Sequence, residues 1–368
     1  MEYWPQVKIG DVCIVERGGS PRPIDKYITD SEDGINWIKI GDTDDSMYIT
    51  STAQKIIPEG AKKSRYVQPG DFLLSNSMSF GRPYILKIDG CIHDGWLVLR
   101  DKNGLFDKRF LYYYLSAPVT YQKFKSLAVG GVVNNLNSEM VRNVEVPLPA
   151  LNEQAQIATV LDKLSGLISL RKQQLAKLDE LVKARFMEMF GDPIRNDKCL
   201  STKELGSICL LKAGITTSTE EIRGYDEEYQ IPCYGGNGIR GYVKTSTQRG
   251  IYPIIGRQGA LCGNVQLAQG YFHATEHAVL VTPLIELNIF WLFYLLKFMD
   301  LYRYHTGAAQ PGLAVKTLNT VNVPIASLDR QNEFAILVEK IDRQKLTIQQ
   351  SLDKLEVLRK SLMQEYFG

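Results

Sequence analysis

One segment of this chain occurs twice, and the duplication constrains the fold more than any short motif does. Residues Val144–Gly191 align without a gap with Val321–Gly368, at a constant offset of 177 residues. Sixteen of the 48 aligned positions are identical, whereas ordinary amino-acid composition would give roughly three matches by chance. A repeat of such long period predicts an alternating architecture, in which a unit and a helix are followed by a second unit and a second helix.

Both copies have the residue spacing of a long amphipathic helix. Apolar side chains recur at steps of three and four residues, with a break at Arg171 in the first copy and breaks at Lys345 and Arg359 in the second. This seam consists of Ile157, Leu161, Leu164, Ile168, Leu175 and Leu178 in the first copy and of Phe334, Val338, Ile341, Leu352 and Leu355 in the second. Neither helical stretch contains a proline, so we expect two helices of about 40 residues, each roughly 60 Å long.

Helices of this length exceed what the core of an average globular domain needs. A buried core helix is therefore the weaker interpretation. The first helix leads out of one unit and into the next, so an antiparallel return of the second helix connects the chain economically. We expect the two helices to pack on each other as a coiled-coil-like spacer.

The remaining segments have the composition of mixed α/β units. Residues 1–143 and 195–320 are rich in Gly, Asn, Ser, Thr and aromatic residues, and short β-like runs alternate with turn signals. The expected fold class is α/β, with two mixed units that have β-rich cores and an internal pseudo-two-fold repeat. The expected boundaries are 1–150 and 192–327 for the units and 151–191 and 328–368 for the helical spacers.

The overall charge gives no signature of nucleic-acid binding. Forty-three basic and 41 acidic residues leave a net charge of +2. A basic groove can lie on a neutral molecule, so we expect that a partner helps this chain to hold any polyanion. No secretory signal and no apolar run long enough to span a bilayer are visible. Six cysteines without a CxxC pair are typical of free thiols in a reducing cytoplasm.

A glycine motif of the phosphate-binding kind occurs in the wrong context. Gly236, Gly238 and Gly241 satisfy the spacing GxGxxG. A strand-like run, Tyr242–Thr245, follows them where a phosphate site requires a helix N-terminus. Turn glycines are the simpler interpretation, and we expect no cofactor bound by this chain.

Two histidines have a spacing that metal ligands can have. His273 and His277 lie four residues apart with Glu276 between them, but the surrounding sequence favours a strand instead of a metalloprotease helix. We expect a polar contact or a core position for His273, and no metal. The sequence has neither a Gly-x-Ser-x-Gly nucleophile elbow nor an amino-methyltransferase motif, so we expect a non-catalytic chain.

Several sequence blocks, taken together and in order, resemble one known family. The blocks are Trp37–Asp42, Ser77–Pro83, His93–Trp96, Tyr234–Ile239, Gly256–Gly259 and the repeated Val144–Gln154. Over essentially the whole chain they resemble the DNA-specificity subunit of type I restriction-modification enzymes. The second repeat departs slightly from the pattern, because Ala326 stands where the first has Pro149.

This resemblance implies two target-recognition domains, each of which reads one half of a bipartite, asymmetric sequence in double-stranded DNA. It implies that the helices set the length of the unread spacer and dock two methyltransferase subunits. Those partners would carry S-adenosylmethionine and methylate adenine at N6. Motor-nuclease subunits would join for restriction.

Loops rich in Gly, Asn, Ser and Arg supply the groups that DNA recognition needs. Arginine pairs with guanine, asparagine or glutamine pairs with adenine, and a compact basic loop suits phosphates. In the first unit we expect contacts from Lys62, Lys63, Ser64, Arg65, Ser77, Arg82, Asn134 and Asn135. In the second unit we expect them from Asn237, Arg240, Arg257, Gln258, Arg303 and Gln310. The alternative for each of these is an ordinary solvated surface residue.

Three rival functions stay open at this point. A nuclease or methyltransferase would need catalytic motifs that the sequence lacks. A twin-domain scaffold that binds carbohydrate or peptide would show no DNA footprint and no methyltransferase partner. The specificity subunit of a type IIB-like system is hardly distinguishable by sequence, and the target sequence depends on loop geometry that composition does not give.

Overall fold

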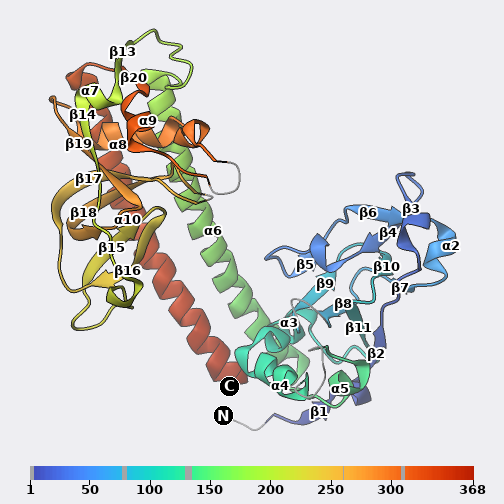
Figure 1. The fold of residues 1–368 in the computed structure, drawn as a ribbon. Helices are drawn as coiled ribbons and strands as arrows, with labels where there is room; N and C mark the ends of the chain where they lie inside the picture. The colour runs from blue at the N-terminus through green and yellow to red at the C-terminus, as the bar shows by residue number, and fades with distance from the viewer. Residues whose placement is uncertain (1–3, 77–80, 129–134, 260, 308–310) are drawn as a thin grey trace. The chain divides into compact units, whose positions relative to one another are not determined.

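The structure, a computed structural model, describes residues 4–76, 81–128, 135–259, 261–307 and 311–368 (Figure 1). The chain divides into two compact units. Unit 1 comprises Met1–Arg171 and Ser351–Gly368, and unit 2 comprises Lys172–Gln350. Each unit therefore contains one variable segment together with a part of each repeated helix.

Both repeats form the long helices that the sequence predicts. Helices α6 (Leu151–Phe190) and α10 (Leu328–Phe367) have 40 residues each. Gly191 ends α6 with a left-handed backbone at φ 77°, and its N–H donates to the Met187 carbonyl at 2.9 Å. A left-handed glycine is the usual end of such a helix, because a side chain would be strained there.

Within unit 2 the two helices run antiparallel. The rings of Phe186 and Phe190 on α6 contact Phe334 on α10, with centroids 5.4 and 5.6 Å apart. Asp179 of α6 forms an ion pair with Lys345 of α10. Residues further along α6 contact residues nearer the start of α10, so the two helices are antiparallel within this unit.

The described part of unit 1 contains two five-stranded mixed sheets. The first has the order β3 (Ile28–Thr29), β6 (Gln54–Ile56), β4 (Ile35–Ile38), β10 (Gly90–Ile92) and β7 (Arg65–Val67). The second has the order β2 (Cys13–Arg17), β11 (Trp96–Asp101), β8 (Phe72–Ser75), β9 (Pro83–Leu86) and β5 (Tyr48–Ile49). Strands β4 and β10 pair in parallel, as do β5 and β9, while the other neighbours are antiparallel.

The helices of unit 1 carry its largest core. Those that follow its sheets in the chain are α3 (Lys108–Ser116), α4 (Pro118–Ala128) and α5 (Ser138–Arg142). Phe110 of α3 is fully buried and packs against Trp4 and Phe367, with ring centroids 6.3 and 5.5 Å apart. The end of α10 is therefore part of the unit 1 core.

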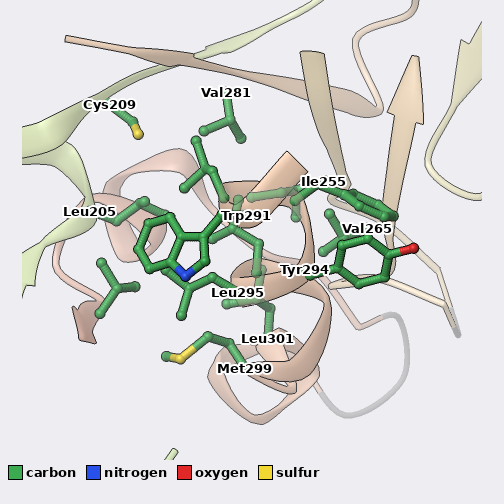
Figure 2. Close-up of a cluster of buried hydrophobic side chains, with 14 of the residues drawn as sticks. Leu205, Cys209, Ile255, Val265, Val281, Trp291, Tyr294, Leu295, Met299 and Leu301 are labelled. Atoms are coloured by element: carbon green, nitrogen blue, oxygen red, sulfur yellow. The ribbon is translucent and has the colours of Figure 1, made fainter. Parts of the chain in front are cut away.

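Unit 2 is built on one sheet, which has six strands in the described residues. Their order is β14 (Cys209–Ala213), β19 (Ala278–Pro283), β17 (Gln248–Gly256), β18 (Val265–Ala274), β15 (Ile231–Gly235) and β16 (Gly238–Val243). Helix α8 (Ile289–Phe298) supplies the centre of its core. Figure 2 shows Trp291 of this helix, fully buried, with Leu205 beside the indole ring.

The two units repeat the same frame at their ends. A two-stranded antiparallel sheet joins β1 (Gln6–Lys8) to β12 (Glu145–Pro147) in unit 1 and β13 (Ser201–Glu204) to β20 (Asn322–Ile325) in unit 2. Short helices follow the first strand of each pair, α1 (Ile9–Val12) and α7 (Leu205–Ile208). Gly10 of α1 and Gly206 of α7 each lie against a neighbouring residue. A Cβ added to Gly10 would lie 2.8 Å from Arg142, and one added to Gly206 would lie 2.8 Å from Asn319. The expected α/β class, with two mixed units and two long helices, is confirmed.

Candidate functional site

The predicted basic loop of unit 1 follows helix α2 (Pro58–Ala61). Lys62 and Lys63 are both exposed. The Lys63 ammonium group donates to the Tyr27 hydroxyl at 2.6 Å and lies 4.9 Å from the centroid of that ring. Two ammonium groups on one turn can contact a phosphate backbone, as the sequence analysis expects.

Ser64 and Arg65, the other members of this loop, hold it against the sheets. The Ser64 hydroxyl donates to the Ile92 carbonyl at 3.0 Å. Arg65 pairs with Glu16 at 3.1 Å, and Arg100 pairs with the same carboxylate at 3.0 Å. These partners fix the loop, and its two lysines stay exposed beside it.

Arg82 is a half-exposed guanidinium held by acidic neighbours. It pairs with Asp45 at 3.0 Å, and it lies 5.5 Å from the centroid of the Tyr84 ring. Asn135 is exposed. The predicted contacts Ser77, Asn134 and Gln310 lie outside the described residues.

Unit 1 also has a polar cleft of about 430 Å³ that the sequence analysis does not predict as a site. Its polar lining residues are Ser20, Arg22, Asp25, Lys39, Gln54, His93 and Asp94, and its apolar ones are Pro21, Ile24, Ile28 and Trp37. They come from four separate segments of the chain. The parallel pair β4–β10 and the antiparallel pair β4–β6 bring three of these segments together.

Asp94 organises one wall of this cleft. Its carboxylate accepts hydrogen bonds from the Ser20 hydroxyl at 2.9 Å and from His93 Nε2 at 3.0 Å. The Gly95 N–H donates to His93 Nδ1 at 2.9 Å, which places the ring proton on Nε2. Burial raises the pKa of Asp94, but the Ser20 hydrogen bond and nearby positive charges outweigh it and lower that pKa below its ordinary value.

Three loops of unit 2 converge where strands β15, β17 and β18 end. The Thr275 N–H donates to the Tyr234 carbonyl at 2.9 Å, and the Arg257 N–H donates to the His277 carbonyl at 3.0 Å. Gly236 lies so close to Gly256 that a Cβ on Gly256 would be 1.8 Å from the Gly236 carbonyl oxygen. Only glycine allows this approach, which brings the β15–β16 turn against the end of β17.

This convergence concentrates buried polar atoms that lack a hydrogen-bond partner within the described residues. They are Arg257 Nε, His273 Nδ1, Thr275 Oγ1, Glu276 Oε2 and His277 Nδ1. Buried polar atoms nearly always have a partner, so a group from outside the chain is a natural source for some of these. Arg257 is among the contacts expected from the sequence, whereas residues 273–277 are not.

His273 is a nearly buried histidine with one polar contact. Its Nε2 lies 2.7 Å from the Thr217 hydroxyl, and the residue is 8% exposed. Burial lowers the pKa of His273 below its ordinary value, which favours the neutral ring. His277 Nε2 pairs with Glu276 at 3.1 Å. Among the described residues no group of three or more His, Cys, Asp or Glu side chains could hold a metal ion.

The other predicted contacts of unit 2 lie around the same loops. Asn237 accepts a hydrogen bond from Asn264 at 2.8 Å, and the Arg240 side chain lies across Gly235. Gln258 is exposed. Arg303 lies on the 3-10 turn Leu301–Tyr304, which packs against the turn after β17, since a Cβ on Gly263 would lie 2.5 Å from the Tyr302 nitrogen.

The predicted helix seam is mostly buried. The buried members are Ile157, Leu161, Leu164, Ile168, Phe334, Val338, Ile341 and Leu352, while Leu175, Leu178 and Leu355 are half-buried. Other apolar side chains of these helices are exposed, among them Leu170, Leu346 and Val357. The buried seam packs within the chain, so exposed positions are the ones available to a partner.

No helix in the described part of the chain has the length and apolar character needed to cross a membrane.

Comparison with known proteins decides the family. A sequence profile described as the type I restriction modification DNA specificity domain matches residues 1–180 and 200–357. The chain belongs to the type I restriction-modification DNA specificity family. The EcoprrI specificity subunit of Escherichia coli is 32% identical over 332 residues, which cover 84% of this chain and 80% of that protein. The MjaIX specificity subunit of Methanocaldococcus jannaschii is 23% identical, and the alignment covers 98% of this chain and 91% of that protein.

Solved structures of specificity subunits have the same fold. The S subunit from M. genitalium matches with a TM-score of 0.65 at 16% identity, over 100% of this chain and 96% of that one. A chain from a structure that describes complex assembly and conformational transition of the type I R-M system matches with a TM-score of 0.59 at 17% identity. The match covers 100% of this chain and 98% of that one. Specificity subunits of this family are non-catalytic, and this chain is such a DNA specificity subunit.

Proposed function

We propose that unit 1 and unit 2 each read one half of a bipartite DNA target, and that α6 and α10 set the length of the unread spacer between the halves. The observation that carries this proposal is a duplicated frame around divergent contents. Both units have the same two-stranded sheet and the same glycine contact at their ends. Between these ends unit 1 has two five-stranded sheets and unit 2 has one six-stranded sheet in the described residues.

Two such different surfaces on one frame suit the recognition of two different sequences. Unit 1 offers the basic loop and the polar cleft, and unit 2 offers the loops around Arg257. Phosphate contacts position a protein on DNA, whereas side chains at base edges give specificity. Each unit has candidates for both kinds of contact.

The partners in this proposal are two methyltransferase subunits, docked on the exposed faces of the long helices, and motor-nuclease subunits for restriction. The methyltransferase subunits carry S-adenosylmethionine and modify adenine. The near-neutral charge of this chain supports a role for partners in DNA binding. A chain with net charge +2 has little overall electrostatic attraction for DNA, so partner subunits add affinity. The complex acts on DNA in the cytoplasm. A type IIB-like system would use the same recognition scheme.

A genome-wide map of methylated adenine tests the proposal. The map compares a host that carries the chain and its neighbouring methyltransferase with a host in which only the chain is deleted. We expect a single split motif with a fixed gap to lose methylation on deletion. An unchanged map would overturn the proposal and favour a scaffold that binds something other than DNA.

A further inference from the structure

We propose that the polar cleft of unit 1 is a base-reading site, in which Arg22, Lys39 and Gln54 contact the edges of bases in one half-site. The proposal rests on the proposed function of unit 1 as a DNA-reading unit. It assigns that reading to residues that are not among the DNA contacts expected from the sequence, and it leaves the nearby lysine loop to bind phosphates.

The wall of the cleft that Lys39 and Gln54 form carries polar groups of the kind that contact base edges. The Lys39 ammonium group donates to the Gln54 side-chain oxygen at 2.7 Å. Within the described residues the Gln54 amide nitrogen has no hydrogen-bond partner, so two amide donors are left for a ligand. Lysine suits the O6 and N7 acceptors of guanine, and glutamine suits adenine. These groups supply hydrogen bonds that distinguish bases.

This wall is held in place by contacts within the chain. Asp42 accepts from the Lys39 main-chain N–H at 2.7 Å through one carboxylate oxygen. Its other oxygen accepts from the Ala53 N–H at 3.1 Å. Asp42 therefore ties the segment that carries Lys39 to the segment that carries Gln54. Side chains fixed in this way lose less conformational entropy on binding than free ones.

Another part of the cleft lining contains Arg22, which is exposed and paired with Asp94. The Arg22 side chain is 83% exposed, and its ion pair with Asp94 spans 3.5 Å. The Arg22 side chain is therefore only loosely restrained by this ion pair, whereas Asp94 itself is fixed by Ser20 and His93. An exposed guanidinium can pair with guanine through two hydrogen bonds. Asp25, also in the lining, adds an acceptor suited to an exocyclic amino group.

The lysine loop, whose cations suit phosphates, lies beside the cleft. Gly19, which precedes the lining residue Ser20, lies against the lysine loop, since a Cβ added there would be 3.2 Å from the Lys63 carbonyl oxygen. Lys63 also donates to Tyr27, two residues beyond Asp25. Cations beside a polar cleft match the division of DNA contacts into phosphate and base contacts.

The experiment measures the sequence preference of the whole complex, with its methyltransferase subunits, on DNA in which each half-site is randomised in turn. The bound fraction is sequenced for the wild type and for Arg22→Ala and Gln54→Leu. We expect each variant to lose about 10-fold of its preference at one or two positions of a single half-site, the same half-site for both, with the other half unchanged.

Two further variants separate base reading from other effects. Lys62→Ala should weaken binding to all sequences alike, because it removes a phosphate contact. Lys102→Ala removes the same charge just after β11, whereas Asp94 lies just before it, and the six residues of that strand span roughly 20 Å. Its ammonium group contacts main-chain carbonyls of Gly10 and Asp11, so we expect no change in preference. Thermal unfolding of each variant shows whether unit 1 remains folded.

The outcomes are distinct. If folded Arg22→Ala and Gln54→Leu complexes keep the wild-type preference in both half-sites, the cleft does not read bases. A uniform loss of affinity would equally overturn the inference and would make the cleft a phosphate or small-ligand site. If the wild-type complex selects no split sequence at all, the proposed function of the chain fails instead.

Discussion

The side-chain oxygen of Gln331 accepts a hydrogen bond from the main-chain N–H of Asn288 at 2.9 Å. Gln154 makes the same contact with Asp107 in unit 1, also at 2.9 Å. Asn288 and Asp107 are the residues that cap the N-termini of α8 and α3. Each long helix is thus attached to the aromatic helix of a unit by one buried glutamine, which explains why this residue is identical in both repeats.

We expect Gln331→Leu to lower the free energy of unfolding by about 2 kcal/mol, because it leaves the partly buried Asn288 N–H and the Ala326 carbonyl without the partners that Gln331 supplies. Gln331 is 1% exposed, and its amide nitrogen also donates to the Ala326 carbonyl at 2.8 Å. Urea denaturation measures the change. Glu333→Ala, at an exposed position two residues further along the helix, is the control and should cost no more than about 0.5 kcal/mol. Equal losses in both variants would contradict the role of Gln331.

The lowered pKa of His273 predicts a pH dependence of stability. Burial makes the folded protein prefer the neutral ring, whereas the unfolded chain binds a proton near the ordinary value of 6.5. The contribution of His273 to stability is therefore complete above that value and is lost as pH falls below it, toward the folded pKa. The slope from one such group cannot exceed about 1.4 kcal/mol per pH unit.

The measurement compares urea denaturation of the wild type and His273→Gln between pH 7.5 and pH 5.5. Glutamine can keep a hydrogen bond to Thr217, which lies 2.7 Å from His273 Nε2. We expect the variant to lose less stability than the wild type over this interval. A parallel loss in both proteins would show that His273 does not protonate on unfolding.

The sequence predicts the helices well because their signals are local. A continuous seam, the absence of proline and the terminal Gly191 all act over a few residues, and the observed α6 ends at the residue before that glycine. Burial of the seam follows from the same periodicity. The division of the chain into alternating units follows from the repeat.

The cleft of unit 1 is not predictable in this way, because pairing of distant strands creates it. Gln54 lies opposite Trp37 on the β4–β6 ladder, and His93 comes just after β10, the parallel neighbour of β4. Neither register has a local sequence signal. The cluster in unit 2 has the same origin, since Arg257 reaches His277 only through the antiparallel pair β17–β19.

Arg257→Ala should weaken recognition of one half-site and leave the other intact. Arg257 lies where the three loops of unit 2 converge, and its Nε has no partner within the described residues. A guanidinium that reads a guanine contributes about 1–3 kcal/mol of discrimination, so we expect a loss of about 10-fold or more at that position. Binding to DNA with each half-site permuted separately measures it.

A matched control lies on the same strand. Arg249 is exposed near the start of β17, with its guanidinium 5.1 Å from the centroid of the Tyr271 ring. Seven residues of strand, roughly 20 Å, separate it from Gly256. Arg249→Ala removes the same charge without touching the loops, so preference should persist. If Arg257→Ala loses as much affinity for unrelated DNA as for the target DNA, this residue does not read a base.

Longer helices should lengthen the unread spacer of the DNA target. The design inserts seven residues into α6 near Leu175 and seven into α10 near Ile348, regions that the ion pair between Asp179 and Lys345 places opposite each other. Seven residues preserve the heptad seam and add about 10.5 Å to each helix. At about 3.4 Å per base pair, the gap should grow by roughly three base pairs.

A methyladenine map of cells that carry the lengthened chain measures the gap, and both half-sites should keep their sequences because neither unit is altered. Insertion into α6 alone is the control. It shifts the residues of α6 out of register with their partners on α10, so it should lower stability without producing a new, uniform gap in the DNA target. If the matched insertion folds, methylates and keeps the original gap, the helices do not determine the spacer, and its length must be set by the methyltransferase partners.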